Sequence, residues 1–389
     1  MTNDSELKEG LYHLFNDTCI KSFNITPHGW QKMIGATIME AVVKKKPLKH
    51  LCARPTGGGK SLVFNVVASL VKQVTICICP LLSLGADQTK KTLAMVDVPS
   101  PPPLTAFHFD EMKLKTVFKL KAKLRDPQLE NIGVIIYMSP QSLSTRNGKA
   151  LIPFLIRNDL IRLIVVDELH LATSFGNTFR KEFRDLPSLL FSRVTCPMLF
   201  LTATCTRAIR NDFEDMMQID LNSMNWPTAN EMAHRCVSIE TNYTTKPFQY
   251  VMKSFKDMIS DSDDDLPSKV IVYSNTRERI LNFADSIRKK MNSDPIMKKI
   301  DIISLVGTLT KQEKTNYIRL FVNGSSKHPH LKIRVLCATS GVGNAGIDCP
   351  DVRAVYRIDF PPSILDLAQE KGRAGRRPGS TTLLISSFL

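Results

Sequence analysis

The sequence lacks the marks of a secreted or membrane-spanning protein. Its nine cysteines are scattered over 389 residues, with neither a disulfide framework nor a paired zinc-ligand spacing. No apolar stretch approaches the roughly 20 residues that span a bilayer, and residues 1–10 are polar and acidic instead of forming a charged and then apolar leader. We therefore expect a soluble, intracellular protein from a reducing compartment, without zinc.

Acidic side chains are scarce relative to basic ones. Lys and Arg number 52 against 37 for Asp and Glu, which gives a formal net charge of +15. This balance favours a polyanionic partner without identifying it. The length of 389 residues exceeds what one hydrophobic core usually supports, so two domains are expected.

Short apolar runs rich in β-branched residues alternate with longer amphipathic stretches. This alternation predicts βα units around parallel sheets that are buried on both faces, and the pattern occurs twice. The expected strands are residues 50–53, 74–79, 104–109, 134–138, 163–167 and 198–202 in the first half, and 270–273, 302–306, 333–337, 354–358 and 382–385 in the second.

The boundary between the halves is expected near Arg235. Residues 220–240 have no clear periodicity and contain several turn formers. The predicted architecture is therefore two tandem α/β domains, residues 1–235 and 236–389, each with a mainly parallel sheet flanked by helices.

A glycine-rich segment, T-G-G-G-K-S at 56–61, follows the first expected strand and precedes an apolar helix at 62–70. Glycines let backbone N–H groups close around phosphate oxygens, the lysine reaches the outer phosphates, and the serine can ligate Mg²⁺. A glycine turn without nucleotide is the alternative, because Arg54 stands where the general pattern has glycine. The nucleotide-binding candidates are Thr56, Gly57, Gly58, Gly59, Lys60 and Ser61.

Two adjacent carboxylates, Asp167 and Glu168 of D-E-L-H, end the apolar run L-I-V-V. That places them at the carboxyl end of a buried strand, where α/β sheets hold ligands. We assign Asp167 to Mg²⁺ and Glu168 to the attacking water, since phosphoryl transfer needs positioning and charge neutralisation. A helix-capping acidic pair is the alternative.

Two arginines, Arg373 and Arg376, lie three residues apart in Q-E-K-G-R-A-G-R at 369–376. An arginine against the γ-phosphate stabilises the charge that spreads in the transition state, an effect worth about 10³ to 10⁵ in rate. The alternative is an ordinary basic helix end, which the helix dipole favours.

Taken together, the three motifs resemble those of a superfamily 2 helicase, and more closely the RecQ family of DNA helicases. Directly after D-E-L-H, the stretch L-A-T-S-F-G-N-T-F-R-K-E-F at 171–183 resembles the aromatic-rich loop of that family in the same register. The resemblance continues at residues 79–88, 137–143, 201–206, 272–277 and 338–350.

The resemblance implies further site residues. In the aromatic-rich loop, Phe175, Phe179 and Arg180 would sense single-stranded DNA, since aromatic faces stack on bases and arginine meets phosphate; two phenylalanines in the core are the alternative. The remaining roles are adenine recognition by Gln31, coupling of hydrolysis to strand movement by Thr202 and Thr204, and contact with the DNA backbone by Ser83, Thr339 and Ser340.

These features lead us to expect a RecA-like motor with the ATP site in the cleft between its domains. The resemblance implies ATP as substrate, Mg²⁺ as cofactor, DNA as track, 3′ to 5′ travel with duplex unwinding, and a nuclear location if the source is eukaryotic.

Two departures from the family pattern keep rival functions open. His28 stands where an arginine usually assists adenine binding, and Asn177 replaces a histidine of the aromatic-rich loop. These substitutions, together with the departure in residues 339–347, suggest one rival, a non-catalytic, ATP-gated nucleic-acid clamp. The other rival, an ATPase that acts on RNA or translocates without unwinding, stays open because we do not expect the zinc module and winged helix that commonly follow the motor in that family.

Overall fold

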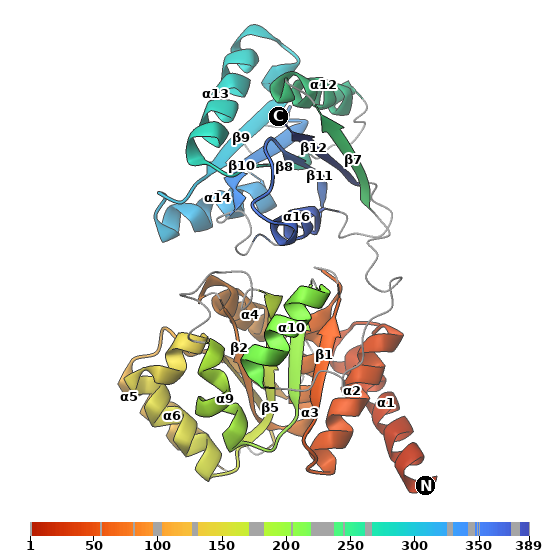
Figure 1. The fold of residues 1–389 in the computed structure, drawn as a ribbon, viewed down its shortest axis with the longest axis vertical. Coiled ribbons are helices and arrows are strands. Elements are labelled where there is room, and N and C mark those ends of the chain that lie inside the picture. Colours follow the sequence, from red (N-terminus) through yellow and green to blue (C-terminus); the bar gives the residue numbers. More distant parts are fainter. Residues whose placement is uncertain are drawn as a thin grey trace. The chain divides into compact units, whose positions relative to one another are not determined.

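The computed structural model describes the chain in two compact units, Met1–Met232 and Ala233–Leu389 (Figure 1). None of the helices within the described ranges is both long and apolar enough to cross a membrane. The described residues are 2–54, 57–80, 82–95, 103–126, 131–170, 183–203, 205–218, 237–243, 246–260, 267–324, 330–340, 347, 349, 351–374 and 382–388.

The first unit contains a six-stranded sheet whose strand order is β1-β6-β5-β2-β4-β3, with every neighbouring pair parallel. Its strands are β1 (Lys49–Ala53), β2 (Gln73–Ile78), β3 (Leu104–His108), β4 (Gly133–Met138), β5 (Ile161–Val166) and β6 (Met198–Thr202). Its helices are α1 (Thr2–Phe23), α2 (Gly29–Val43), α3 (Lys60–Val71), α4 (Leu82–Ala94), α5 (Leu114–Lys123), α6 (Arg146–Arg157), α9 (Leu186–Leu189) and α10 (Arg207–Met217), with short 3-10 turns at Pro140–Ser144 and Phe191–Arg193.

The second unit repeats this arrangement. Its sheet has the order β7-β12-β11-β8-β10-β9, and all its pairs are parallel. When β7 is counted as the first strand of this sheet, the order is the same as in the first unit. The elements are β7 (Val237–Tyr243), α12 (Pro247–Ser260), β8 (Ser268–Ser274), α13 (Arg277–Ser293), a 3-10 turn at Met297–Lys299, β9 (Ile300–Leu305), α14 (Lys311–Asn323), β10 (Ile333–Thr339), β11 (Val352–Arg357), α16 (Ile364–Lys371) and β12 (Thr382–Phe388).

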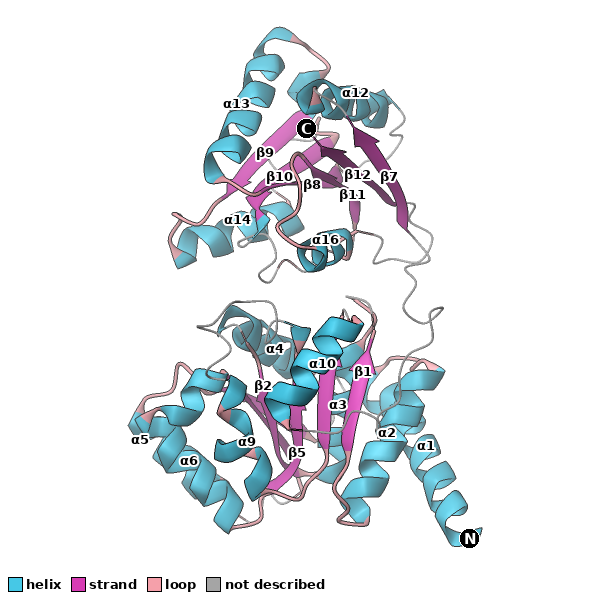
Figure 2. Cartoon of the chain, viewed as in Figure 1, coloured by secondary structure: helices cyan, strands magenta, loops and turns pink. Residues whose placement is uncertain are grey.

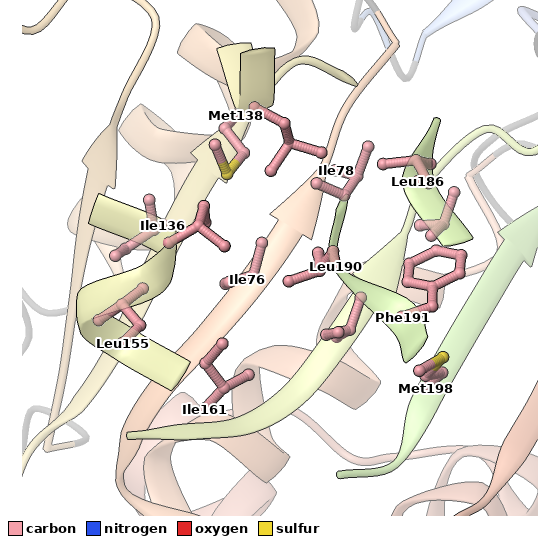
Figure 3. Packing of buried hydrophobic residues seen from close by; sticks show 14 of the residues in the cluster. Ile76, Ile78, Ile136, Met138, Leu155, Ile161, Leu186, Leu190, Phe191 and Met198 are labelled. Carbon is pink, nitrogen blue, oxygen red and sulfur yellow. The ribbon is translucent and has the colours of Figure 1, made fainter. Parts of the chain in front are cut away.

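Each sheet is buried on both faces because successive side chains of a strand point to opposite sides. In β4, Ile136 and Met138 join the core cluster under α5, α6, α9 and α10 (Figure 3), whereas Ile135 and Tyr137 join the cluster under α1, α2 and α3. In the second unit, α12 and α13 cover one face and α14 packs on the other (Figure 2). The expectation of two parallel α/β sheets flanked by helices is confirmed.

The expected strands agree with the structure to within a few residues at each end, with one omission. We expected no strand in the weakly patterned segment 220–240, yet β7 begins at Val237 at the edge of the second sheet. Its sequence, V-S-I-E-T-N-Y, alternates apolar and polar residues, which is the pattern of a half-buried strand and not of the continuous apolar runs used to find the others.

Candidate nucleotide site

The glycine-rich loop lies where β1 leads into α3. Gly57 and Gly59 have φ of 78° and 81°, a left-handed conformation that glycine adopts without strain. Gly59 is the residue before the first turn of α3, so the loop delivers the chain to a helix N-terminus, the position where backbone N–H groups bind phosphate. The structure places Gly58 in the same turn, whereas Thr56 lies outside the described residues.

Gln31 joins this loop to the first turn of α2. Its buried side chain donates a hydrogen bond from Nε2 to the carbonyl oxygen of Gly59 (2.9 Å) and accepts one at Oε1 from the backbone N–H of His28 (2.6 Å). A Cβ atom at Gly59 would lie 2.6 Å from that Nε2. Gln31, which was expected to recognise adenine, is therefore in direct contact with the glycine loop.

Lys60 and Arg54 form the floor of the loop. The Nζ of Lys60 is largely buried and donates to the carbonyl oxygen of Arg54 (2.8 Å). The Arg54 guanidinium lies 4.7 Å from the centre of the Trp30 ring, which is stacked on the His28 ring with 6.4 Å between centroids and 13° between planes. The arginine that breaks the general glycine pattern thus packs on an aromatic platform. Sequence reasoning noted Arg54 and His28 only as departures and missed Trp30.

The two carboxylates stand directly after β5. Asp167 is buried, its N–H donates to the carbonyl oxygen of Ile78 (2.9 Å), and its Oδ1 accepts from the N–H of Glu168 (2.9 Å). Burial, followed by the neighbouring charge of Glu168, raises the pKa of Asp167 to about 7, and the positive charge of Lys60 opposes this rise. Glu168 has φ of 48°, a conformation that a non-glycine residue keeps only under constraint from its surroundings.

His170, which sequence reasoning assigned no role, links the carboxylates to β6. Its buried Nδ1 lies 3.4 Å from Oε2 of Glu168 and 3.1 Å from Oγ1 of Thr202. Thr202 ends β6, which is hydrogen-bonded between β1 and β5, and its carbonyl oxygen accepts from the N–H of Arg54 (3.0 Å). Thr202 therefore connects the glycine loop, through Arg54, with the carboxylates, through His170. In the sequence, His170 could have been found only as the last residue of the motif D-E-L-H.

The other residues expected in the first unit are only partly placed. Ser61 lies in the first turn of α3, where its Oγ accepts from Nε2 of Gln88 (3.3 Å). Ser83 lies in α4. Residues 171–182 of the aromatic-rich loop fall outside the described residues, as does Thr204. The expected loop residues so excluded are Phe175, Phe179 and Arg180.

In the second unit, a buried arginine gathers the corresponding strand ends. Arg357 ends β11, and its Nη1 donates to Oε1 of Glu370 in α16 (2.5 Å) and to Oγ of Ser340 (3.0 Å). Its Nη2 donates to Oδ1 of Asn275, and its guanidinium lies 3.1 Å from Oδ1 of Asp359. We call Arg357 with these four partners the arginine hub. The role of Arg357 was not predicted, because the partners of an arginine in an apolar strand cannot be read from the local sequence.

This hub positions α16 and the residues that follow it. Arg373 comes two residues after the helix, and its Nη1 donates to the carbonyl oxygen of Ile347 (2.6 Å). Thr339 is the last residue of β10, directly before Ser340, which the hub holds. Desolvation raises the pKa of Glu370 to about 7, and the charge of Arg357 opposes the rise. Arg376 lies outside the described residues.

The fold is that of a two-domain α/β protein, and its glycine loop at a helix N-terminus has the arrangement that other α/β proteins use to bind phosphate. The family comparison is more specific. Residues 32–211 match the family "DEAD/DEAH box helicase", and residues 248–378 match "Helicase conserved C-terminal domain". The chain therefore belongs to the superfamily 2 helicases and carries their two-domain, RecA-like core.

Individual relatives are distant. The chain is 27% identical to the ATP-dependent DNA helicase hus2/rqh1 of Schizosaccharomyces pombe over 83% of its length, and 24% identical to the ATP-dependent DNA helicase RecQ of Pasteurella multocida over 90%. These matches span 22% and 48% of those proteins. A similar solved structure is that of Mss116p bound to single-stranded RNA and AMP-PNP, with a TM-score of 0.66 and 16% identity, covering 99% of this chain and 74% of that one.

Proposed function

We propose that this chain is a RecQ-like motor that hydrolyses ATP to move 3′ to 5′ along single-stranded DNA and unwind duplex. The observation that carries the proposal is the contact chain from the glycine loop through Thr202 and His170 to Glu168. It joins the candidate phosphate-binding loop to a candidate water-activating carboxylate at the carboxyl ends of neighbouring strands. A glycine turn without nucleotide does not require that link.

The donor set at these strand ends fits Mg²⁺. Burial and the charge of Glu168 raise the pKa of the Asp167 carboxyl, so a cation beside it would favour its ionised form, and Ser61 offers a hydroxyl oxygen at the start of α3. Ser61 and Asp167 would hold the ion, which when bound neutralises charge on the transferred phosphate. Gly57, Gly58 and Gly59 bind phosphate through backbone N–H groups, and Gln31 fixes the loop.

Within this site, Lys60 holds the outer phosphates and Glu168 orients the attacking water and accepts its proton. His170 lies beside the receiving carboxylate of Glu168 and positions it. Arg373 and Arg376 stabilise the transition state in our proposal, and the hydrogen bond of Arg373 to Ile347 is the resting contact that it would exchange for phosphate.

The test of hydrolysis uses two variants with different expected defects. Lys60→Ala removes both ATP binding and turnover, whereas Glu168→Gln removes turnover but retains ATP, because the glutamate acts on water. Nucleotide binding and steady-state hydrolysis are measured side by side, with exposed Lys115→Ala as the control. Turnover near the parent rate in either site variant would overturn the assignment.

DNA is favoured over RNA by the sequence of the aromatic-rich loop and by the names of the distant relatives. Phe175→Ala with Phe179→Ala should retain basal hydrolysis and lose most stimulation by single-stranded DNA, since each stacked base contributes about 1 to 3 kcal/mol. Melting curves of the double variant control for loss of folding. Full stimulation of a well-folded double variant would remove the loop assignment.

RNA is the second candidate track, because the structurally similar Mss116p was solved with single-stranded RNA. Hydrolysis with matched DNA and RNA strands, read beside unwinding of a 3′-tailed DNA duplex, separates the possibilities. Stimulation by RNA alone would replace DNA as the track. Stimulation without unwinding would define a translocase, and nucleotide binding without turnover would define a clamp.

A further inference from the structure

The first unit has a second concave site at the amino-terminal ends of its strands, at the end of the sheet opposite the glycine loop. A cavity of about 310 Å³ lies where α2 and α6 end and where β5 and β6 begin. The glycine loop follows the carboxyl end of β1, at the opposite end of the same parallel sheet, and a six-residue strand such as β5 spans about 20 Å. None of the residues that we assign to ATP or DNA lines this cavity.

The cavity combines an apolar floor with a basic rim. Ile156 and Val194, both partly buried and packed against the core cluster, contribute to the floor. Lys45, Arg162 and Arg193 line the same space. Arg162 pairs with Asp159 at 3.3 Å, but Lys45 and Arg193 have no ion-pair partner within the described part of the chain. A ligand here meets apolar surface and uncompensated positive charge together.

Two helix ends at the rim carry charged residues where glycine is preferred. At the end of α2, the N–H groups of Lys46 and Lys45 donate to the carbonyl oxygens of Ala41 and Val42, and Lys45 has φ of 50°. This double hydrogen bond closes many helices, with glycine the usual residue at the left-handed position.

The end of α6 repeats the arrangement. The N–H groups of Leu160 and Asp159 donate to the carbonyl oxygens of Leu155 and Ile156, and Asp159 has φ of 46°. Both left-handed residues therefore bring a charged side chain to the cavity at the expense of backbone strain.

We propose that this cavity docks an acidic peptide segment of a partner protein through one apolar anchor side chain. The floor fits the anchor, and the unpaired Lys45 and Arg193 attract flanking carboxylates. Nucleic acid is disfavoured, because phosphate contacts need the basic rim but make no use of an apolar floor. The proposal does not depend on the proposed motor function, because the site lies at the opposite end of the sheet.

The test measures fluorescence anisotropy of the full chain with a labelled octapeptide in which Asp and Glu flank a central Leu-Phe pair. Matched probes replace Leu-Phe by Ser-Ser, replace the acids by Lys, or substitute oligo(dT). We expect binding of the acidic Leu-Phe peptide alone, weakened about tenfold by Lys45→Ala with Arg193→Ala. Lys115→Ala with Lys119→Ala, which removes equal charge from exposed α5 positions, should leave binding unchanged.

The helix ends give a sharper pair of variants. Lys45→Gly and Asp159→Gly should both raise the melting temperature, because glycine suits the left-handed position. Their effects on peptide affinity should be opposite, a severalfold loss for Lys45→Gly and a severalfold gain for Asp159→Gly. ATP hydrolysis should not change in either, so a failure of this site is distinguishable from a failure of the motor proposal.

Three outcomes would overturn the docking site. One is no binding of the acidic Leu-Phe peptide at millimolar concentration. Another is equal binding of the Ser-Ser peptide or of oligo(dT) through Lys45 and Arg193, which would make the rim a general polyanion surface. The third is a shift of affinity in the same direction, or no shift, in the two glycine variants.

Discussion

At the scale of single residues, the site is marked by groups in environments that a stable fold would avoid. Asp167 is a buried carboxylate beside a second one, and Glu168 holds a left-handed backbone. Each of these features lowers stability, and a cation beside Asp167 would offset the cost of its buried charge. In our proposal, Mg²⁺ binding therefore relieves part of the cost of folding around Asp167.

The raised pKa of Asp167 predicts a pH-dependent stability. Because the pKa of this carboxyl is about 7 in the folded protein and 3.8 in the unfolded chain, the protein loses stability as pH rises through that window, on the order of 4 kcal/mol when Asp167 is fully charged. In EDTA, Asp167→Asn should match the parent near pH 4 and unfold at higher temperature at pH 8.

Asp285→Asn is the control for this measurement, because Asp285 is exposed. Its melting curves should follow those of the parent at every pH. Parallel pH profiles for the parent and Asp167→Asn would contradict the assignment of a buried, ionisable Asp167.

The contact between Gln31 and Gly59 predicts a steric defect. Gly59→Ala places a methyl group 2.6 Å from Nε2 of Gln31 at φ of 81°, so we expect a loss of about 1–3 kcal/mol in unfolding free energy together with weaker ATP binding. Gly29→Ala, at a helical position with no atom within 4 Å of the added carbon, should stay within about 0.5 kcal/mol of the parent. Chemical denaturation compares the two, and equal stability would count against a close contact between the loop and the glutamine.

At the scale of elements, Arg357 holds a strand, a helix and two loops of the second unit in one network. Arg357→Met leaves Glu370 buried without its partner, which should cost about 3–5 kcal/mol. Adding Glu370→Gln should recover part of that loss, giving a coupling of about 1–3 kcal/mol in a double-mutant cycle. The exposed pair Arg288 and Asp285 is the comparison, with a coupling below about 1 kcal/mol. Additive effects of Arg357→Met and Glu370→Gln would show that the pair does not act as a unit.

The burial of a strand decided whether it could be predicted from the sequence. Strands buried on both faces are continuous apolar runs, so their positions were found from sequence, whereas β7 at a sheet edge alternates and was missed. The loop and the two carboxylates were also identifiable, because each sits directly after a strand. The contacts of Gln31 with Gly59 and of His170 with Thr202 join residues 28 and 32 apart. No local pattern contains such contacts, and only the folded sheet brings the partners together.

At the scale of the whole molecule, each unit has its own sheet with cores on both faces. We expect two unfolding transitions in calorimetry, since each unit can lose its packing separately. A non-hydrolysable ATP analogue with Mg²⁺, at 100 times its dissociation constant, should raise the unfolding free energy of the unit that binds it by about 2.7 kcal/mol. Only the transition of that unit should shift. Lys60→Ala should abolish that shift, and a single cooperative transition would contradict the separation of the two cores.

The repeated strand order also predicts how many nucleotide sites each chain has. In the first unit the first strand leads through glycines to Lys60 at the start of α3, and in the second the corresponding strand, β7, leads through T-T-K to Pro247 at the start of α12. Proline has no N–H to offer a phosphate, and the segment before it has no glycine to wrap one. Of these two corresponding positions, only the first therefore has a glycine loop, and our proposal predicts that each chain binds one ATP molecule at a time.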